Sequence, residues 1–187
     1  MSIDKSLLDF NLSDELVEIG ELVREICEKE VVPRRAELDE KEAYPFEIFA
    51  KFKEAGLPGI MYDAEYGGMG VGLFAAIVFS EIVSEYCLGV NTAISATKLG
   101  ALPIEHGGTE EQKKKYLSAF ASGEKIGAFG LTEPNAGSDV PSLSTTAVKK
   151  GDRYVLNGVK QWISNAGVAD VYTIFALTDK SKGPRGM

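Results

Sequence analysis

Residues 127–139 read GAFGLTEPNAGSD, and this stretch decides the interpretation of the chain. The residues from Ile126 to Leu131 are small or apolar and predict a short buried strand. A hydroxyl at Thr132 follows, Pro134 stiffens the turn, and Gly137 allows the backbone to approach a ligand closely. Such a loop suits a flat polar heterocycle or a phosphate better than it suits core packing.

A second informative stretch, KQWISN, occupies residues 160–165. It contains Trp162, the only tryptophan of the chain, two residues before the hydroxyl of Ser164. If the stretch is a strand, both side chains lie on the same face. Taken separately, each of the two stretches also fits an ordinary β-turn and an edge strand, without any ligand.

Composition excludes several classes of function. The 187 residues carry a net charge of −8, which argues against a nucleic-acid partner because that partner requires a basic face. The single histidine, His106, leaves neither a metal cluster nor a Ser-His-Asp set. Cys27 and Cys87 lie in apolar-periodic stretches and are interpreted as buried thiols rather than a disulfide, in a reducing compartment. No signal peptide is evident, and the apolar run Leu73–Phe79 is too short to span a membrane.

The first two thirds of the chain show helical periodicity. An apolar stripe begins the pattern, with Ser13 as the expected N-cap and Pro33 as the expected break. The stripe consists of Leu12, Leu16, Ile19, Val23 and Ile26. Further helices are predicted over Pro45–Gly56, Leu73–Cys87, Asn91–His106 and Thr109–Ser122. We expect Leu73–Cys87, which is apolar nearly all round, to form a central helix whose apolar faces this chain alone leaves partly uncovered, and Pro103 to break the helix that contains it.

After Gly123 the period changes from near 3.6 to near 2. Strands are predicted over Ser144–Lys149, Tyr154–Ile163 and Val171–Thr178, with a turn at residues 150–153. The fold class is therefore α+β, with an all-α helical domain at 1–122 and an incomplete antiparallel, barrel-like β domain at 123–187. Because no βαβ unit is present, a nicotinamide-dependent enzyme is disfavoured.

The motifs LTEP-x-AGSD and W-I-S-N, in this order and separation, closely resemble the flavin-binding middle domain of the acyl-CoA dehydrogenase family. The resemblance extends over the whole chain, including the first helix, the loop EYGGMG at 65–70 and the segment GTEEQK at 108–113. The amino-acid sequence of these motifs is similar to that of bacterial short-chain, butyryl-CoA type members. The resemblance implies a C-terminal helical domain beyond residue 187 that holds the catalytic base, so no catalytic residue is expected in this chain.

The resemblance also implies a set of site residues. The FAD-contacting positions would be Phe129, Leu131, Thr132, Ser138, Trp162, Ile163 and Ser164. Ser138 would also contact the coenzyme A part of the substrate, and the acyl pocket would be lined by Asn91, Thr92, Ser95 and Leu99. Two positions depart from the common family pattern, since Phe129 replaces Tyr and Ser164 replaces Thr. Ser138 also fits a turn, and the residues of the 91–99 helix also fit ordinary packing.

The implied activity is FAD-dependent α,β-dehydrogenation of an acyl-CoA, with electrons passed to an electron-transferring flavoprotein. A homotetramer in the bacterial cytoplasm, or in the mitochondrial matrix if the source is eukaryotic, is expected, without a metal, a nucleic acid or a membrane partner. Two alternatives remain open. One is an acyl-CoA oxidase-like flavoenzyme that uses oxygen, and the other is a non-catalytic fragment or binding module. We expect residues 1–187 alone to be inactive and to bind FAD weakly.

Overall fold

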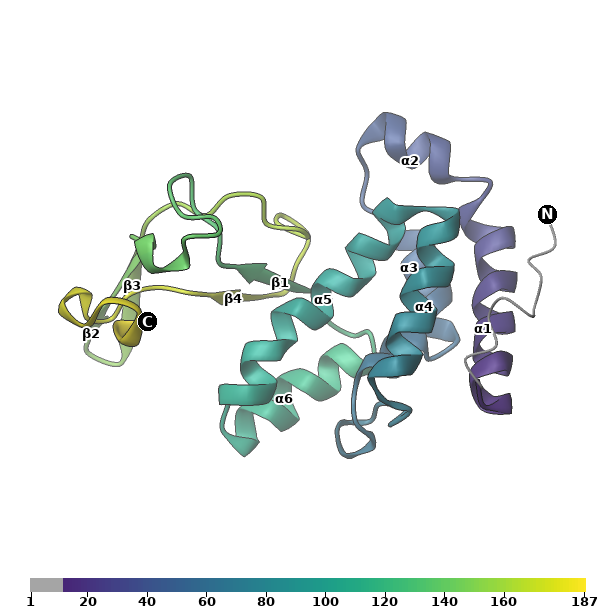
Figure 1. Ribbon diagram of the computed structural model, residues 1–187, viewed down its shortest axis with the longest axis horizontal. Helices are drawn as coiled ribbons and strands as arrows, with labels where there is room; N and C mark the ends of the chain where they lie inside the picture. Colours follow the sequence, from purple (N-terminus) through teal and green to yellow (C-terminus); the bar gives the residue numbers. More distant parts are fainter. Residues whose placement is uncertain (1–11) are drawn as a thin grey trace. The chain divides into compact units, whose positions relative to one another are not determined.

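The computed structural model describes residues 12–187, and its helices and strands are shown in Figure 1. The chain forms two compact units, Met1–Thr92 and Ala93–Met187. The division between them falls inside helix α5, Leu88–Gly107, rather than at the change of period near Gly123. The reason lies in hydrogen bonds that connect the later turns of α5 to the strands. The domain boundary at 122/123 stays a prediction.

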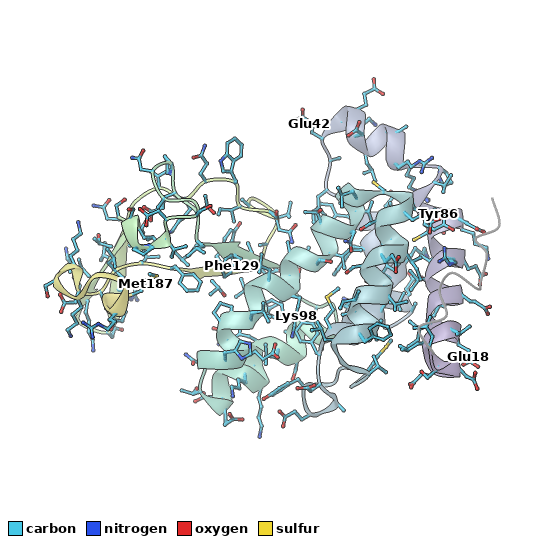
Figure 2. The ribbon with its side chains drawn as sticks, viewed as in Figure 1. Glu18, Glu42, Tyr86, Lys98, Phe129 and Met187 are labelled. Carbon is cyan, nitrogen blue, oxygen red and sulfur yellow. The ribbon has the colours of Figure 1, made fainter. Side chains whose placement is uncertain are left out.

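The first unit is helical. Ser13 caps its first helix, since its hydroxyl accepts a hydrogen bond from the Leu16 N–H at 3.3 Å, as predicted. The first turn of this helix is acidic, and the exposed Glu18, labelled in Figure 2, follows it. The elements are α1 (Asp14–Ile26), a π-helical turn (Cys27–Val31), α2 (Arg35–Lys41), α3 (Phe46–Glu54), 3₁₀ turns at Leu57–Met61 and Ala64–Tyr66, and α4 (Gly72–Tyr86).

Helices α1 and α4 lie side by side in this unit (Figure 1), and α3 contacts the 3₁₀ turn at Leu57–Met61 and the π-helical turn. The rings of Phe52 and Phe79 meet edge-on, with centroids 5.6 Å apart, and both are buried. Gly20 lets α1 approach α4 closely, because a Cβ at this position would lie 3.3 Å from Cδ1 of Ile82. The expected break of the first helix is confirmed, since the α-helical pattern ends in the π-helical turn just before Pro33.

Helix α4 is apolar nearly all round, and this chain covers only one of its faces, as predicted. Its buried residues Ala75, Phe79, Ile82 and Val83 form one face, whereas Leu73, Phe74 and Ile77 are exposed. A helix that is apolar nearly all round can be buried on any side. Its sequence does not show which of its faces the rest of the chain covers.

The second unit combines the later part of α5 with α6 and the strands. Pro103 lies inside α5 without ending it, so the predicted break is wrong. Loss of one backbone hydrogen bond is tolerated because the neighbouring turn is held by Thr173, whose hydroxyl donates to the Gly100 carbonyl at 2.7 Å. The further elements are α6 (Glu110–Ala121), β1 (Gly127–Gly130), β2 (Thr146–Lys150), β3 (Arg153–Asn157), β4 (Val171–Ile174) and 3₁₀ segments at Val140–Ser142 and Lys180–Gly186.

The sheet prediction is right for one strand pair and wrong for the other. Strands β2 and β3 form the predicted antiparallel hairpin, with Lys150 paired to Arg153 across a turn that contains Gly151 at φ 64°. Strands β1 and β4 instead pair in parallel, with Gly127 opposite Val171. Within residues 12–187 the strands form two-stranded sheets and no closed barrel. Alternation along a strand fixes which face is buried, but it does not fix the direction of the partner strand.

Two glycines allow α5 to lie against β1. A Cβ at Gly100 would stand 3.0–3.1 Å from the backbone of Ala128, and one at Gly127 would stand 3.0 Å from the Thr97 carbonyl oxygen. The Gly127 N–H also donates to the buried hydroxyl of Thr97 at 3.1 Å. This contact places the start of the 127–139 loop directly against the helix.

Gly100→Ala is therefore expected to lower the free energy of unfolding by about 1–3 kcal/mol, because the new methyl group meets backbone that cannot move aside. Gly107→Ala is the matched control in the same helix, since a Cβ there meets nothing within 4 Å. The control is expected to be neutral or to stabilise by up to about 1 kcal/mol through helix propensity. Chemical denaturation of both variants measures the difference. Equal stability of the two would contradict the close approach of α5 to β1.

Candidate functional site

Hydrogen bonds bring the two informative stretches of sequence together. The Gln161 N–H donates to the Thr132 carbonyl at 2.9 Å, and the Lys160 ammonium donates to the Leu131 carbonyl at 2.9 Å. The loop that follows β1 therefore lies beside the segment that carries Trp162. Thr132 contributes its backbone carbonyl, not its hydroxyl, to these contacts.

The loop itself is closed by a tight turn. Backbone hydrogen bonds run both ways between Glu133 and Ala136, at 3.0 and 3.1 Å. Ala136 is buried, whereas Pro134 is exposed. A Cβ at Gly137 would meet nothing within 4 Å, so the backbone there is open to a neighbour. The turn thus presents its backbone next to the half-buried Thr132.

Glu133 is a buried acid that the sequence analysis passed over. Its side chain is 3% exposed, and it forms an ion pair of 2.8 Å with Lys160, whose side chain is 11% exposed. The carboxylate also accepts from the Ser144 N–H at 2.8 Å, the Ser144 hydroxyl at 2.7 Å and the Thr145 N–H at 3.0 Å. An acid within an otherwise small and apolar loop, followed by a lysine in the second stretch, was the available signal.

These contacts keep Glu133 ionised. Burial by itself would raise the pKa of its carboxyl group, but the hydrogen bonds from Lys160, Thr145 and Ser144 outweigh burial and hold the pKa well below its usual range. Glu133 therefore acts as a permanent acceptor at neutral pH.

The Trp162 segment is not the strand that the sequence predicts. Strand β3 ends at Asn157, and Trp162 and Asn165 adopt left-handed backbone conformations with φ of 59° and 64°. The argument that Trp162 and Ser164 share one face of a strand is therefore wrong. The segment is held instead by Asn165, whose amide donates to the carbonyls of Ala93 at 2.9 Å and Gly127 at 3.1 Å.

The expected flavin-contacting residues differ in exposure. Phe129 lies on β1, where Figure 2 labels it, and its half-buried ring meets Phe175 edge-on at 5.3 Å between centroids. Trp162 is 83% exposed. Leu131, Thr132 and Ile163 are half-buried, and Ser138 and Ser164 are exposed. Ser138 lies just before the 3₁₀ turn Val140–Ser142. The structure thus brings Leu131 and Thr132 to the Trp162 segment, while it leaves Ser138 on the surface.

The expected substrate residues all lie on α5. Asn91 and Thr92 belong to the first unit, and Ser95 and Leu99 belong to the second. Asn91 and Ser95 are half-buried, whereas Thr92 and Leu99 are exposed. The Thr92 hydroxyl donates to the Leu88 carbonyl at 2.9 Å, within the helix. In the second unit, the hydrogen bond from Asn165 to the Ala93 carbonyl ties the Trp162 segment to this helix, two residues before Ser95 and six before Leu99.

Within residues 12–187 no three His, Cys, Asp or Glu side chains gather as metal ligands. None of the described helices is long and apolar enough to span a membrane. Both cysteines are free thiols; Cys27 is buried, as predicted, whereas Cys87 is only half-buried. Burial raises the pKa of the Cys27 thiol to about 12, which makes it unreactive.

Comparison with known proteins identifies the family. Residues 13–124 match the family model of the acyl-CoA dehydrogenase N-terminal domain, and residues 128–187 match that of the middle domain. A short-chain specific acyl-CoA dehydrogenase from Clostridium acetobutylicum is 48% identical over 181 residues, which are 96% of this chain and 48% of the relative. The chain thus spans about half the length of the curated relatives it matches.

Solved structures share the fold. A structure described as the electron transferring flavoprotein of Acidaminococcus fermentans aligns with a TM-score of 0.90 and 45% identity, over 95% of this chain and 47% of that one. An acyl-CoA dehydrogenase of Bacillus anthracis complexed with FAD aligns with a TM-score of 0.84 and 36% identity, over 90% of this chain and 29% of that one. The sequence motifs, the helical and strand units and these matches lead to one conclusion. The chain belongs to the acyl-CoA dehydrogenase family.

Proposed function

We propose that this chain supplies part of the flavin and substrate site of an FAD-dependent acyl-CoA dehydrogenase. The observation that carries the proposal is the hydrogen-bonded junction between the Thr132 loop and the Trp162 segment. The junction holds two motifs, separated in the sequence, as one surface. The similarity to a dehydrogenase solved with FAD supports the choice of cofactor.

The residues at the junction fit a flavin. Thr132 and Ser164 carry hydroxyls, Phe129 and Trp162 carry aromatic rings, and Gly137 leaves the backbone open. The isoalloxazine ring needs hydrogen-bonding groups at its pyrimidine edge and flat apolar contacts on its faces. We assign the ring contacts to Leu131, Ile163 and these side chains. When bound, FAD would supply the acceptor for the hydride from the β carbon of the substrate.

For the substrate we propose a short-chain acyl-CoA, as in the relative from Clostridium acetobutylicum. Ser138, exposed at the end of the loop, would contact the coenzyme A part. Asn91, Thr92, Ser95 and Leu99 on α5 would line the acyl chain. We propose no residue of this chain as the base that removes the α proton.

The helical domain is placed at 1–122 and the β domain at 123–187, which the matched family ranges support.

For the electron acceptor we propose an electron-transferring flavoprotein, in line with the description of the matching structure from Acidaminococcus fermentans. A homotetramer is proposed as the assembly of the full-length protein. The free thiols and the bacterial relative favour the bacterial cytoplasm as its location.

The test uses the protein at its natural full length. We expect it to be yellow, to release FAD on denaturation, and to oxidise butyryl-CoA faster than long-chain acyl-CoA esters with an electron-transferring flavoprotein as acceptor. A colourless protein that does not take up added FAD would overturn the assignment. Turnover with oxygen that equals turnover with the flavoprotein would favour the oxidase alternative instead.

A further inference from the structure

We propose that the buried pair Glu133–Lys160 is a positioning device that fixes the Thr132 loop against the Trp162 segment. The inference rests on the proposed function in one respect, namely that the surface so fixed receives the flavin. Neither residue belongs to the set that the family resemblance assigned to the cofactor or the substrate.

Lys160 contacts the chain on both sides of Thr132. The Lys160 ammonium donates both to the Leu131 carbonyl at 2.9 Å and to the Glu133 carboxylate at 2.8 Å. Those two acceptors flank Thr132 in the sequence, and Trp162 lies two residues after Lys160. One ammonium group therefore holds both neighbours of Thr132 close to the start of the Trp162 segment.

The Glu133 carboxylate is also held by the chain that enters β2. Its two carboxylate oxygens accept from the backbone N–H groups of Ser144 and Thr145, just before β2. The pair thus connects three segments, namely the loop after β1, the chain entering β2, and the chain entering the Trp162 segment. A contact that served one segment alone would not set the spacing among all three.

The contacts of Glu133 fit a positioning role better than a catalytic role or a role in stability alone. Lys160, Ser144 and Thr145 occupy both oxygens of Glu133, so its carboxylate has no role as a proton acceptor for a substrate. A buried ion pair is also no better for stability than well-packed apolar side chains of similar volume. What the pair provides beyond an apolar contact is a directional set of bonds that defines one arrangement.

The experiment uses the full-length protein with Glu133→Gln, Lys160→Met and the double variant Glu133→Gln/Lys160→Met. Amide hydrogen exchange is measured at Gln161 without FAD, and the FAD dissociation constant is measured separately by titration of the apoprotein. Gln161 is the informative amide because its acceptor, the Thr132 carbonyl, is not altered by any of the substitutions. Glu105→Gln is the matched control, since Glu105 forms a partly buried ion pair with Lys98 on α5.

We expect exchange at Gln161 to accelerate by about tenfold in Glu133→Gln, which corresponds to a loss of roughly 1.4 kcal/mol of local stability. FAD binding should weaken by about tenfold because the site is no longer preorganised. The double variant should recover folding stability, since no buried charge is left unpaired, but exchange at Gln161 and FAD binding should stay impaired. The control should change neither readout.

Unchanged exchange at Gln161 in Glu133→Gln would overturn the inference. Recovery of exchange and FAD binding together with stability in the double variant would also overturn it, since it would show a merely structural role. If the wild-type protein binds no FAD, the proposed function fails, and the exchange data alone still decide whether the pair positions the loop. If Glu133→Gln does not fold, the double variant provides the same decision.

Discussion

Lys160→Met is expected to lower the free energy of unfolding by about 3–5 kcal/mol, because it leaves the buried Glu133 carboxylate without its counter-charge. The Leu131 carbonyl also loses its donor. Chemical denaturation at neutral pH measures the effect. The matched control is Lys182→Met, whose ion pair with Asp179 is exposed and should contribute less than about 1 kcal/mol. A similar loss for the two variants would contradict the importance of burial.

The pH dependence gives an independent check of the same pair. The pKa of Glu133 in the folded protein lies below its value in the unfolded chain, which is about 4.3 for a glutamate. The unfolded state therefore binds the proton more readily, and the stability that Glu133 contributes is fully present above that value and is lost as the pH falls below it. The difference between wild type and Lys160→Met should be largest near neutral pH and should shrink below about pH 4. A difference that grows on acidification would show that the sign is wrong.

Asn165→Asp is expected to lower the free energy of unfolding by about 2–4 kcal/mol, because a carboxylate cannot donate to the two carbonyls that the Asn165 amide serves. Those carbonyls belong to Ala93 and Gly127, so the substitution brings like partial charges together in a partly buried place. Aspartate tolerates the left-handed conformation about as well as asparagine, so the backbone cost is similar. Thermal unfolding at neutral pH measures the effect.

The matched control for Asn165→Asp is Asn157→Asp, since Asn157 is exposed at the end of β3. That change should stay within about 0.5 kcal/mol, as is usual for surface substitutions. If both variants lost the same stability, the negative charge alone would explain the effect, and the role assigned to the Asn165 amide would be wrong.

The sequence predicted the helices well because their signals are local. The Ser13 cap and the Thr109–Gln112 capping box are both present, the latter with hydrogen bonds of 2.8 and 3.2 Å. Each signal depends on residues three positions apart, so no distant part of the chain is needed to interpret it. The prediction failed at Pro103, where contacts from β4 outweigh the local preference.

The site was predicted only in part for the same physical reason. The approach of the Thr132 loop to Trp162 was expected from the motif pair, but the means of holding it was not. Glu133 and Lys160 are 27 positions apart, and nothing in the alternation of the sequence marks them as partners. The left-handed conformation of Trp162 likewise follows from tertiary hydrogen bonds, and its β propensity alone favours a strand.

The parallel pairing of β1 with β4 has a consequence for how the chain acquires its structure. A helix such as α6 can form from hydrogen bonds between near neighbours, within microseconds. Strand β1 cannot form in this way, because its ladder hydrogen bonds are made with β4. That strand follows the hairpin and the Trp162 segment in the sequence. Pairing between strands that lie far apart in the sequence costs loop-closure entropy, and this cost slows folding. The ladder that precedes the Thr132 loop is therefore completed late, and during synthesis it cannot form until residues near Ile174 have left the ribosome.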